Sequence, residues 1–208
     1  MTLTLYHCKN ARSLRALWML EEMGLDYDLQ VLPFPPRMFQ KEYLGVNPLG
    51  TIPYLIDGDT RMTESSGICH YLGERYGVRA GRTDLTLKPE DPDYGAYLNW
   101  LFYSDATLTF PQTIVLRYTQ LEPPERRLAQ AAADYRAFFY GRLRLTDATL
   151  RDKDYLVANR FTAADICVGY PIFLAKWIGI AEDIPAHLND YWARLEARPA
   201  FQRAVAKK

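Results

Sequence analysis

The sequence is poor in cysteine and histidine, with 3 of each among its 208 residues. Cys8, Cys69 and Cys167 are odd in number and far apart, and no C-x-x-C pair occurs, so neither a disulfide framework nor a thiolate metal site is predicted. So few histidines also argue against a histidine-rich metal centre. Unpaired thiols are typical of a reducing compartment, and we expect a cytoplasmic protein without a bound metal.

An excess of charge and long apolar runs are missing as well. There are 25 basic and 25 acidic residues, and balanced charge gives no electrostatic attraction to nucleic acid or to an anionic membrane. No apolar stretch approaches the ~20 residues of a membrane-spanning helix. The N-terminal residues lack the basic flank and apolar core of a signal peptide. We therefore expect no nucleic-acid partner and no membrane partner.

The first part of the chain alternates strand and helix signals. Residues 2–6 alternate as in a strand, residues 14–23 have helical spacing that ends at Gly24, and residues 27–32 form a second strand. The remaining elements are a short irregular helix at 38–44, strands at 52–56 and 60–62 around the turn Asp57-Gly58, and a helix from Glu64 that stops at Gly77. The predicted order is β-α-β-α-β-β-α, with the first pair of strands parallel and the last pair a hairpin.

Strand signals end at a polar stretch, residues 79–92, which is the best candidate for a linker. Helical patterns follow at about 94–120, 125–152, 163–179, 185–198 and from Pro199 to the end. The sequence therefore predicts an α/β domain at 1–78, the linker at 79–92, and an all-α domain, a helical bundle, at 93–208.

Small hydroxyls and a carboxylate open the helix that begins near Glu64. In one interpretation they only cap free backbone N–H groups and suit the positive end of the helix dipole. In the other, the helix N-terminus and Ser65 bind a carboxylate while Glu64 pairs with an amine. That second arrangement fits the head group of an α-amino acid.

The peptide Ile52-Pro53 follows a glycine-containing turn and opens a strand. A proline in this setting is often cis, and a cis bond here exposes the Ile52 N–H and C=O to a peptide ligand. The alternative is an ordinary trans proline at the edge of a strand.

The loop 7–13 runs directly into a helix. A thiolate placed there is stabilised by the helix N–H groups, by the dipole, and by a side-chain donor such as Asn10 or Ser13. In the simpler interpretation, Ser13 is an N-cap and Asn10 a turn residue.

Taken together, these segments resemble the glutathione transferase family, in particular its cytosolic theta-like and beta-like bacterial members. The matching segments are Leu5–His7, Ser13–Leu25, Asn47–Pro53 and Glu64–Ile68. A further match, Phe161–Ile166, combines a capping box with a hydrophobic staple and serves folding. The resemblance implies a thioredoxin-like N-terminal domain followed by a helical bundle.

The resemblance also implies glutathione as co-substrate. Ile52 is then expected to pair antiparallel with the cysteinyl backbone of glutathione, beside a cis Pro53. Glu64 and Ser65 are expected to hold the γ-glutamyl amine and carboxylate. The glycine end is expected near residues 37–41, with Lys41 as its contact.

The residue that contacts the thiol is left open among Asn10, Ser13 and Tyr6. The position at which reductase-type members carry a nucleophilic cysteine is occupied by Asn10. Cys8 either forms a mixed disulfide or, like the other two cysteines, is a buried inert thiol.

The implied activity is transfer of glutathione to a small hydrophobic electrophile, a detoxification reaction that depends on thiolate stabilisation and proximity. Four aromatic residues are candidates for the electrophile pocket, although core packing is the simpler explanation for each: Trp100, Tyr103, Phe110 and Tyr118. Two alternatives are glutathione-dependent peroxide reduction and a non-enzymatic binding or dimerisation module. The resemblance further implies a homodimer, formed through the helices at 66–75 and 94–103.

Overall fold

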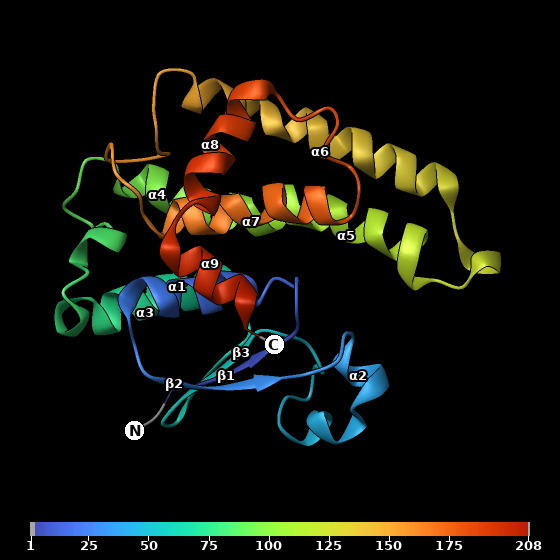
Figure 1. Ribbon diagram of the computed structural model, residues 1–208, viewed down its shortest axis with the longest axis horizontal. Helices are drawn as coiled ribbons and strands as arrows, with labels where there is room; N and C mark the ends of the chain where they lie inside the picture. Colours follow the sequence, from blue (N-terminus) through green and yellow to red (C-terminus); the bar gives the residue numbers. More distant parts are fainter. Residues whose placement is uncertain (1–2, 208) are drawn as a thin grey trace. The chain divides into compact units, whose positions relative to one another are not determined.

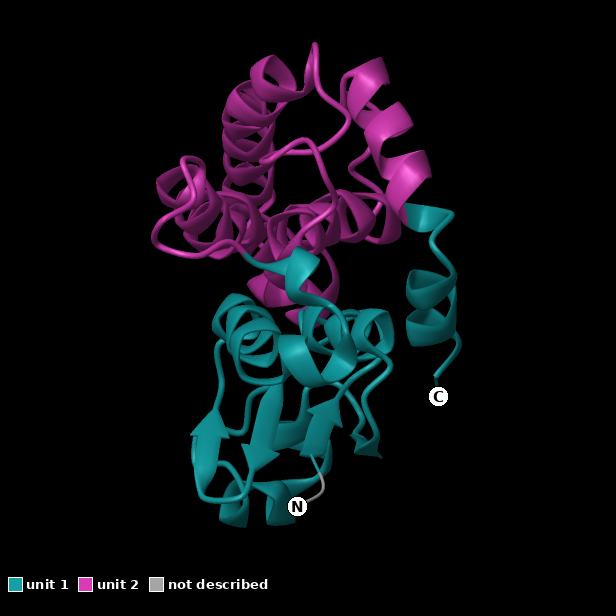
Figure 2. Cartoon of the chain, turned by 90° about the vertical axis from the view of Figure 1, so that its left-hand side faces the viewer, with its two compact units in different colours: residues 1–86, 196–208 teal, residues 87–195 magenta. Residues whose placement is uncertain are grey.

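The structure, a computed structural model, describes residues 3–207, and the chain divides into two compact units. Unit 1 comprises Met1–Thr86 together with Glu196–Lys208, and unit 2 comprises Leu87–Leu195 (Figure 2). Unit 1 thus includes the end of the chain, which the sequence analysis assigned to the all-α domain. The predicted boundaries themselves stay a prediction.

Unit 1 is built around a four-stranded mixed sheet (Figure 1). Its elements are β1 (Leu3–His7), α1 (Leu14–Met23), β2 (Tyr27–Val31), α2 (Pro36–Phe39), the 3₁₀-helix η1 (Lys41–Gly45), β3 (Tyr54–Asp57), β4 (Thr60–Met62), α3 (Ser65–Ala80), the 3₁₀-helix η2 (Thr83–Leu85) and α9 (Pro199–Ala206). The strand order is β2-β1-β3-β4; β1 pairs with β2 in parallel, and the other pairs are antiparallel. The predicted element order, the parallel first pair and the final hairpin are confirmed.

Burial explains why β1 and α1 form at the centre of unit 1. In β1, Leu3, Leu5 and His7 are buried and the intervening residues are half-buried, which is the period-two alternation of a strand. Every residue of α1 from Leu14 to Leu20 is buried, so this helix is enclosed on all sides. It packs against α3 and α9 (Figure 1).

Some predicted boundaries in unit 1 are wrong, among them those of the irregular helix at 38–44, which is observed as α2 and η1. α3 does not stop at Gly77 but continues to Ala80 and ends at Gly81, whose φ of 65° is the left-handed conformation that glycine adopts readily. A Cβ at Gly77 would lie 3.3 Å from the Arg82 carbonyl oxygen, so this glycine permits the segment after the helix to pack closely against it. β3 begins at Tyr54, two residues later than predicted.

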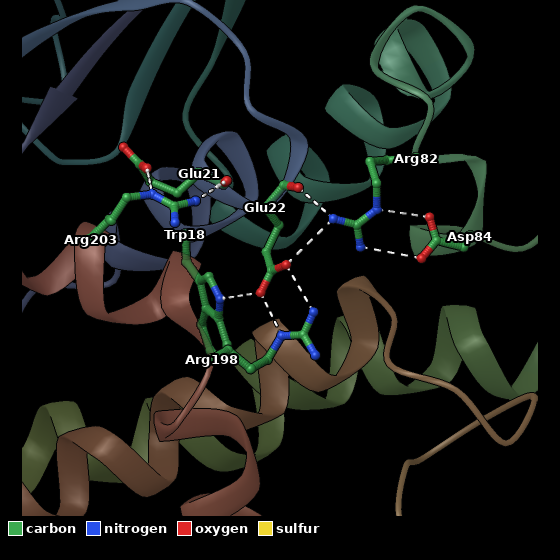
Figure 3. A network of polar contacts seen from close by, with 7 residues as sticks. All are labelled: Trp18, Glu21, Glu22, Arg82, Asp84, Arg198 and Arg203. Atoms are coloured by element: carbon green, nitrogen blue, oxygen red, sulfur yellow. Dashed lines mark hydrogen bonds and ion pairs between the residues drawn. The ribbon is translucent and has the colours of Figure 1, made fainter.

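Polar contacts fix the last helix, α9, to α1 (Figure 3). The Glu22 carboxylate accepts hydrogen bonds from Trp18 Nε1 at 3.0 Å and from Arg198 Nε at 2.6 Å. Next to it, Glu21 Oε2 lies 2.7 Å from Arg203 Nε. Since the Glu22 side chain is only 4% exposed, its partners satisfy a charge that would be costly to bury alone. The end of the chain is thus bonded to the first helix of unit 1.

Unit 2 is helical throughout its regular structure. Its elements are α4 (Tyr94–Tyr103), the π-helical turns η3 (Ser104–Thr109) and η4 (Arg117–Leu121) on either side of α5 (Phe110–Leu116), the 3₁₀-helix η5 (Pro124–Arg126), α6 (Ala129–Leu150), α7 (Ala163–Trp177) and α8 (Ala186–Glu196). The predicted helix at 94–120 is confirmed, although π-helical turns interrupt its α-helical geometry. Among residues 3–207, none of the helices combines the length and apolarity needed to cross a lipid bilayer.

The predicted capping box opens α7. Asp165 Oδ2 accepts the Thr162 N–H at 2.8 Å, while the Thr162 hydroxyl accepts the Ala164 N–H at 3.3 Å. The other oxygen of the Asp165 carboxylate accepts the Leu156 N–H and the Tyr191 hydroxyl. One fully buried carboxylate therefore holds together the start of α7, the preceding loop and α8.

Candidate functional site

The loop that connects β1 to α1 is closed by hydrogen bonds among its own buried residues. Ser13 Oγ accepts the Cys8 N–H at 3.2 Å, lies 3.4 Å from the Cys8 carbonyl oxygen, and is 2.8 Å from His7 Nδ1. Ser13 is fully buried. Burial lowers the pKa of His7 to about 4, so this imidazole is neutral at pH 7. The hydroxyl of Ser13 is thus committed to partners inside the loop.

Cys8 lies at the start of the same loop but is not a nucleophile in this setting. It is fully buried, and its Sγ donates to the Pro33 carbonyl oxygen at 3.6 Å. Burial raises the pKa of Cys8 to about 12, which keeps it a thiol at neutral pH. Cys69 and Cys167 are also buried, as predicted.

Asn10 and Tyr6 have more access to solvent than Ser13. Asn10 is half-buried at the tip of the loop, in the left-handed conformation with φ of 59°, which asparagine tolerates better than most residues. Tyr6 is half-buried on β1, with its ring centroid 5.2 Å from that of Tyr43. Both side chains therefore remain candidates for a contact with a bound thiol.

One apolar cluster joins the first loop to the segment around Ile52. Its buried members are Cys8, Ala11, Leu32, Tyr43, Ile52 and Tyr54, and Tyr6 packs against it. The two segments that the sequence suggested for a ligand are therefore neighbours, although 42 positions separate Asn10 from Ile52.

The bond Ile52-Pro53 is cis, as predicted, and a second cis bond, Phe34-Pro35, was not anticipated. Ile52 lies just before β3 and is 7% exposed. The preceding carbonyl, of Thr51, accepts hydrogen bonds from Tyr43 Oη at 2.8 Å and from Asn47 Nδ2 at 2.9 Å. Sequence reasoning did not assign these two residues a role at the site.

The N-terminus of α3 presents Glu64 and Ser65 in different ways. Glu64 is exposed and extended, with φ −90° and ψ 114°, and its side chain does not cap the helix. Ser65 is 1% exposed, and its Oγ accepts a hydrogen bond from Arg15 Nη1 at 3.0 Å. This role of Arg15 was not predicted from the sequence. The feature that could have indicated it is that Arg15 is the one charged residue in the otherwise apolar run from Leu14 to Leu20.

The other candidates are spread over both units. Lys41 is exposed at the first residue of η1. In unit 2, Trp100 is 4% exposed and stacks edge-on against Tyr103, whose hydroxyl donates to the Arg142 carbonyl oxygen. Phe110 is 49% exposed and contacts Tyr135, and the half-buried Tyr118 lies under the Arg117 guanidinium. The burial of Trp100 favours core packing over a role in a pocket wall.

Within residues 3–207, no group of three or more histidine, cysteine, aspartate or glutamate side chains is placed to hold a metal ion.

Comparison with known proteins decides the family. A sequence profile described as "Glutathione S-transferase, N-terminal domain" matches residues 11–75. Glutathione S-transferase 2 of Schizosaccharomyces pombe is 30% identical over 170 residues, which span 78% of this chain and 71% of the yeast protein. The chain belongs to the glutathione S-transferase family.

Other members of the family match the chain over almost its whole length. Glutathione S-transferase 3 of S. pombe is 25% identical over 218 residues, which span 99% of this chain and 87% of the relative. The theta class glutathione S-transferase of Xanthomonas axonopodis pv. citri, whose crystal structure has glutathione bound, is 26% identical with a TM-score of 0.79 and covers 100% of this chain and 98% of its own. These relatives support the thioredoxin-like assignment of unit 1, the helical assignment of unit 2, and the glutathione S-transferase enzyme class.

Proposed function

We propose that this family member binds glutathione on unit 1 and activates its thiol for attack on a small hydrophobic electrophile. The observation that carries the proposal is the apolar cluster that brings Cys8 and Ala11 of the first loop together with Ile52. A tripeptide aligned along Ile52 then has its cysteine near that loop. The glutathione bound to the Xanthomonas relative supports the same ligand for this chain.

In this proposal the N-terminus of α3 binds the γ-glutamyl group. The first N–H groups of a 16-residue helix and the Ser65 hydroxyl attract the carboxylate, because the positive end of the helix dipole favours an anion. The exposed Glu64 pairs with the amine, and Lys41 with the glycine carboxylate. The Ile52 N–H and C=O bond the cysteinyl backbone, and Pro53 follows them without a donor of its own.

The thiol is activated mainly by hydrogen bonding. Asn10 is the preferred donor, because it is half-buried at the tip of the loop, whereas the Ser13 hydroxyl is fully buried and Tyr6 packs against the apolar cluster. The thiol proton leaves to solvent, and the amide of Asn10 together with the N-terminus of α1 stabilises the thiolate. The sulfur then forms a bond with the electrophilic carbon while the leaving group departs with its electron pair.

We expect the electrophile to contact Tyr103, Phe110 and Tyr118, whereas the buried Trp100 packs against Tyr103. Phe110 is exposed and the two tyrosines are half-buried, and accessible aromatic surface suits a hydrophobic substrate. A cytoplasmic location and a homodimer complete the proposal.

The proposal is tested by calorimetric titration of glutathione together with two steady-state assays, one with a chlorinated nitrobenzene and one with an organic hydroperoxide. We expect binding and turnover of the aryl chloride. Binding with turnover of the hydroperoxide alone would reassign the reaction, and an absence of heat on titration would remove the glutathione site altogether.

A further inference from the structure

We infer that Tyr43 and Asn47 are positioning residues that fix the direction of the Ile52 N–H toward a bound peptide. Both side chains donate to the Thr51 carbonyl oxygen, at 2.8 Å and 2.9 Å. The inference rests on the proposed function, because it assigns a role within the same glutathione site.

The geometry of the peptide group carries the argument. The Thr51–Ile52 bond is not among the cis bonds of the described chain, so its C=O and N–H point in opposite directions. The C=O is turned to the Tyr43 and Asn47 side chains, and the N–H must therefore face away from them. Within residues 3–207, no backbone hydrogen bond outside the helices and strands takes up the Ile52 N–H. The N–H thus remains available to a ligand.

Burial of Tyr43 and Asn47 stabilises their two hydrogen bonds to the Thr51 carbonyl oxygen. Tyr43 is 2% exposed and Asn47 is 1% exposed. If the Thr51 carbonyl turned away, each buried donor would lose this acceptor, which costs free energy. Burial also raises the pKa of Tyr43 to about 12, which keeps the phenol protonated as a donor. Asn47 Oδ1 accepts the Leu49 N–H at 3.1 Å, and this contact directs Nδ2 of the same amide toward Thr51.

Two donors on one acceptor also polarise the peptide group. Hydrogen bonds to a C=O strengthen the bond that the N–H of the same peptide makes, because successive dipoles in a low-dielectric setting reinforce one another. A peptide ligand therefore meets a donor that is already aimed, and less ordering is needed on binding.

Gly50 allows the turn that follows η1 to adopt its conformation. Its φ of 58° is left-handed, and a Cβ there would lie 2.8 Å from both Arg37 Cβ and Leu44 Cδ2. A residue with a side chain at position 50 would therefore disturb the turn that delivers Thr51 to its two donors.

Tyr43→Phe tests the inference by removing one donor while keeping the ring. Tyr54→Phe is the matched control, because it deletes a hydroxyl from the same apolar cluster. The first readout is the amide proton shift of Ile52 in ¹H–¹⁵N spectra of the ligand-free protein. We expect Tyr43→Phe to move this resonance upfield and Tyr54→Phe to leave it in place.

The second readout is affinity for glutathione and for its depsipeptide analogue, in which an ester replaces the Cys–Gly amide and weakens the cysteinyl carbonyl as an acceptor. Tyr43→Phe should weaken glutathione binding by about 5-fold. The variant should also prefer glutathione over the ester analogue by a smaller factor. The ester weakens the hydrogen bond from the Ile52 N–H to the cysteinyl carbonyl, and in Tyr43→Phe this bond is already weaker. Asn47→Asp keeps the acceptor for Leu49 and removes the donor to Thr51, so it should act in the same direction if Tyr43→Phe does not fold.

An Ile52 resonance and a ligand ratio that match those of Tyr54→Phe would overturn the inference. Failure of the proposed function gives a different pattern, since the unsubstituted protein would then not bind glutathione at all. In that case the amide shift of the ligand-free protein still decides whether Tyr43 orients the peptide.

Discussion

Two serines stand at the starts of two helices of unit 1, and they differ in the partner of their hydroxyl. Ser13 precedes α1 and Ser65 begins α3, and both are buried. Ser13 exchanges hydrogen bonds with the Cys8 backbone and a neutral His7, whereas Ser65 accepts from the Arg15 guanidinium. A guanidinium has no acceptor, so the contact with Arg15 uses a lone pair of Ser65 and does not consume the hydroxyl proton.

The comparison separates the structural role of Ser13 from the binding role proposed for Ser65. By sequence alone, each serine is equally compatible with a cap and with a ligand contact. The partners differ because Arg15 brings a fixed positive charge to the N-terminus of α3, while burial keeps His7 uncharged. One pH titration and two substitutions test this difference.

The largest effect is expected from acid. Between pH 6.5 and 4 the unfolded chain binds more protons at His7 than the folded chain, so the free energy of unfolding falls as the pH is lowered through this window. A folded pKa of about 4 corresponds to a loss of about 3 kcal/mol below that pH. Urea unfolding at pH 7 and pH 4 measures it, with His7→Asn as the variant that should lack this part of the loss. An equal loss in the variant would show that His7 does not contribute.

Ser65→Ala should give the next largest effect. The glutathione carboxylate loses a donor that Arg15 polarises, and hydrogen bonds to charged groups contribute about 2 kcal/mol, so the dissociation constant should rise by roughly 10-fold to 30-fold. Calorimetric titration measures this change. Ser65→Thr retains the hydroxyl and serves as control; an unchanged affinity for the alanine variant would place the carboxylate elsewhere.

Ser13→Ala should have the smallest effect, and on stability rather than on binding. The Cys8 N–H and His7 Nδ1 lose a buried partner, which costs about 1 kcal/mol of unfolding free energy. Thermal unfolding and glutathione titration of the same variant separate the two quantities. Loss of glutathione binding with stability intact would make Ser13 a ligand contact after all.

The sequence predicts the local elements of unit 1 well because they depend on local patterns. The alternation of β1, the apolar run of α1 and the turn between β3 and β4 are all readable within a few residues. Gly77 misled the prediction because glycine serves both to end helices and to admit close neighbours, and only the packed chain shows that it does the latter.

The partners that distinguish the two serines were not predictable in the same way. Arg15 meets Ser65 across 50 positions, and Arg198 meets Glu22 across 176. Such contacts depend on how helices pack, and no periodicity in the sequence encodes them. The Ile52-Pro53 segment was recognisable from its motif, whereas its support by Tyr43 and Asn47 required the structure.

The thiol pKa of bound glutathione tests the account most directly, followed as thiolate absorbance at 240 nm against pH in the protein and two variants. We expect the bound thiol to ionise at a lower pH than free glutathione, Asn10→Ala to reverse much of this shift, and Ser13→Ala to leave it unchanged. A bound thiol that titrates like the free tripeptide, or a shift that depends on Ser13 and not on Asn10, would contradict the account.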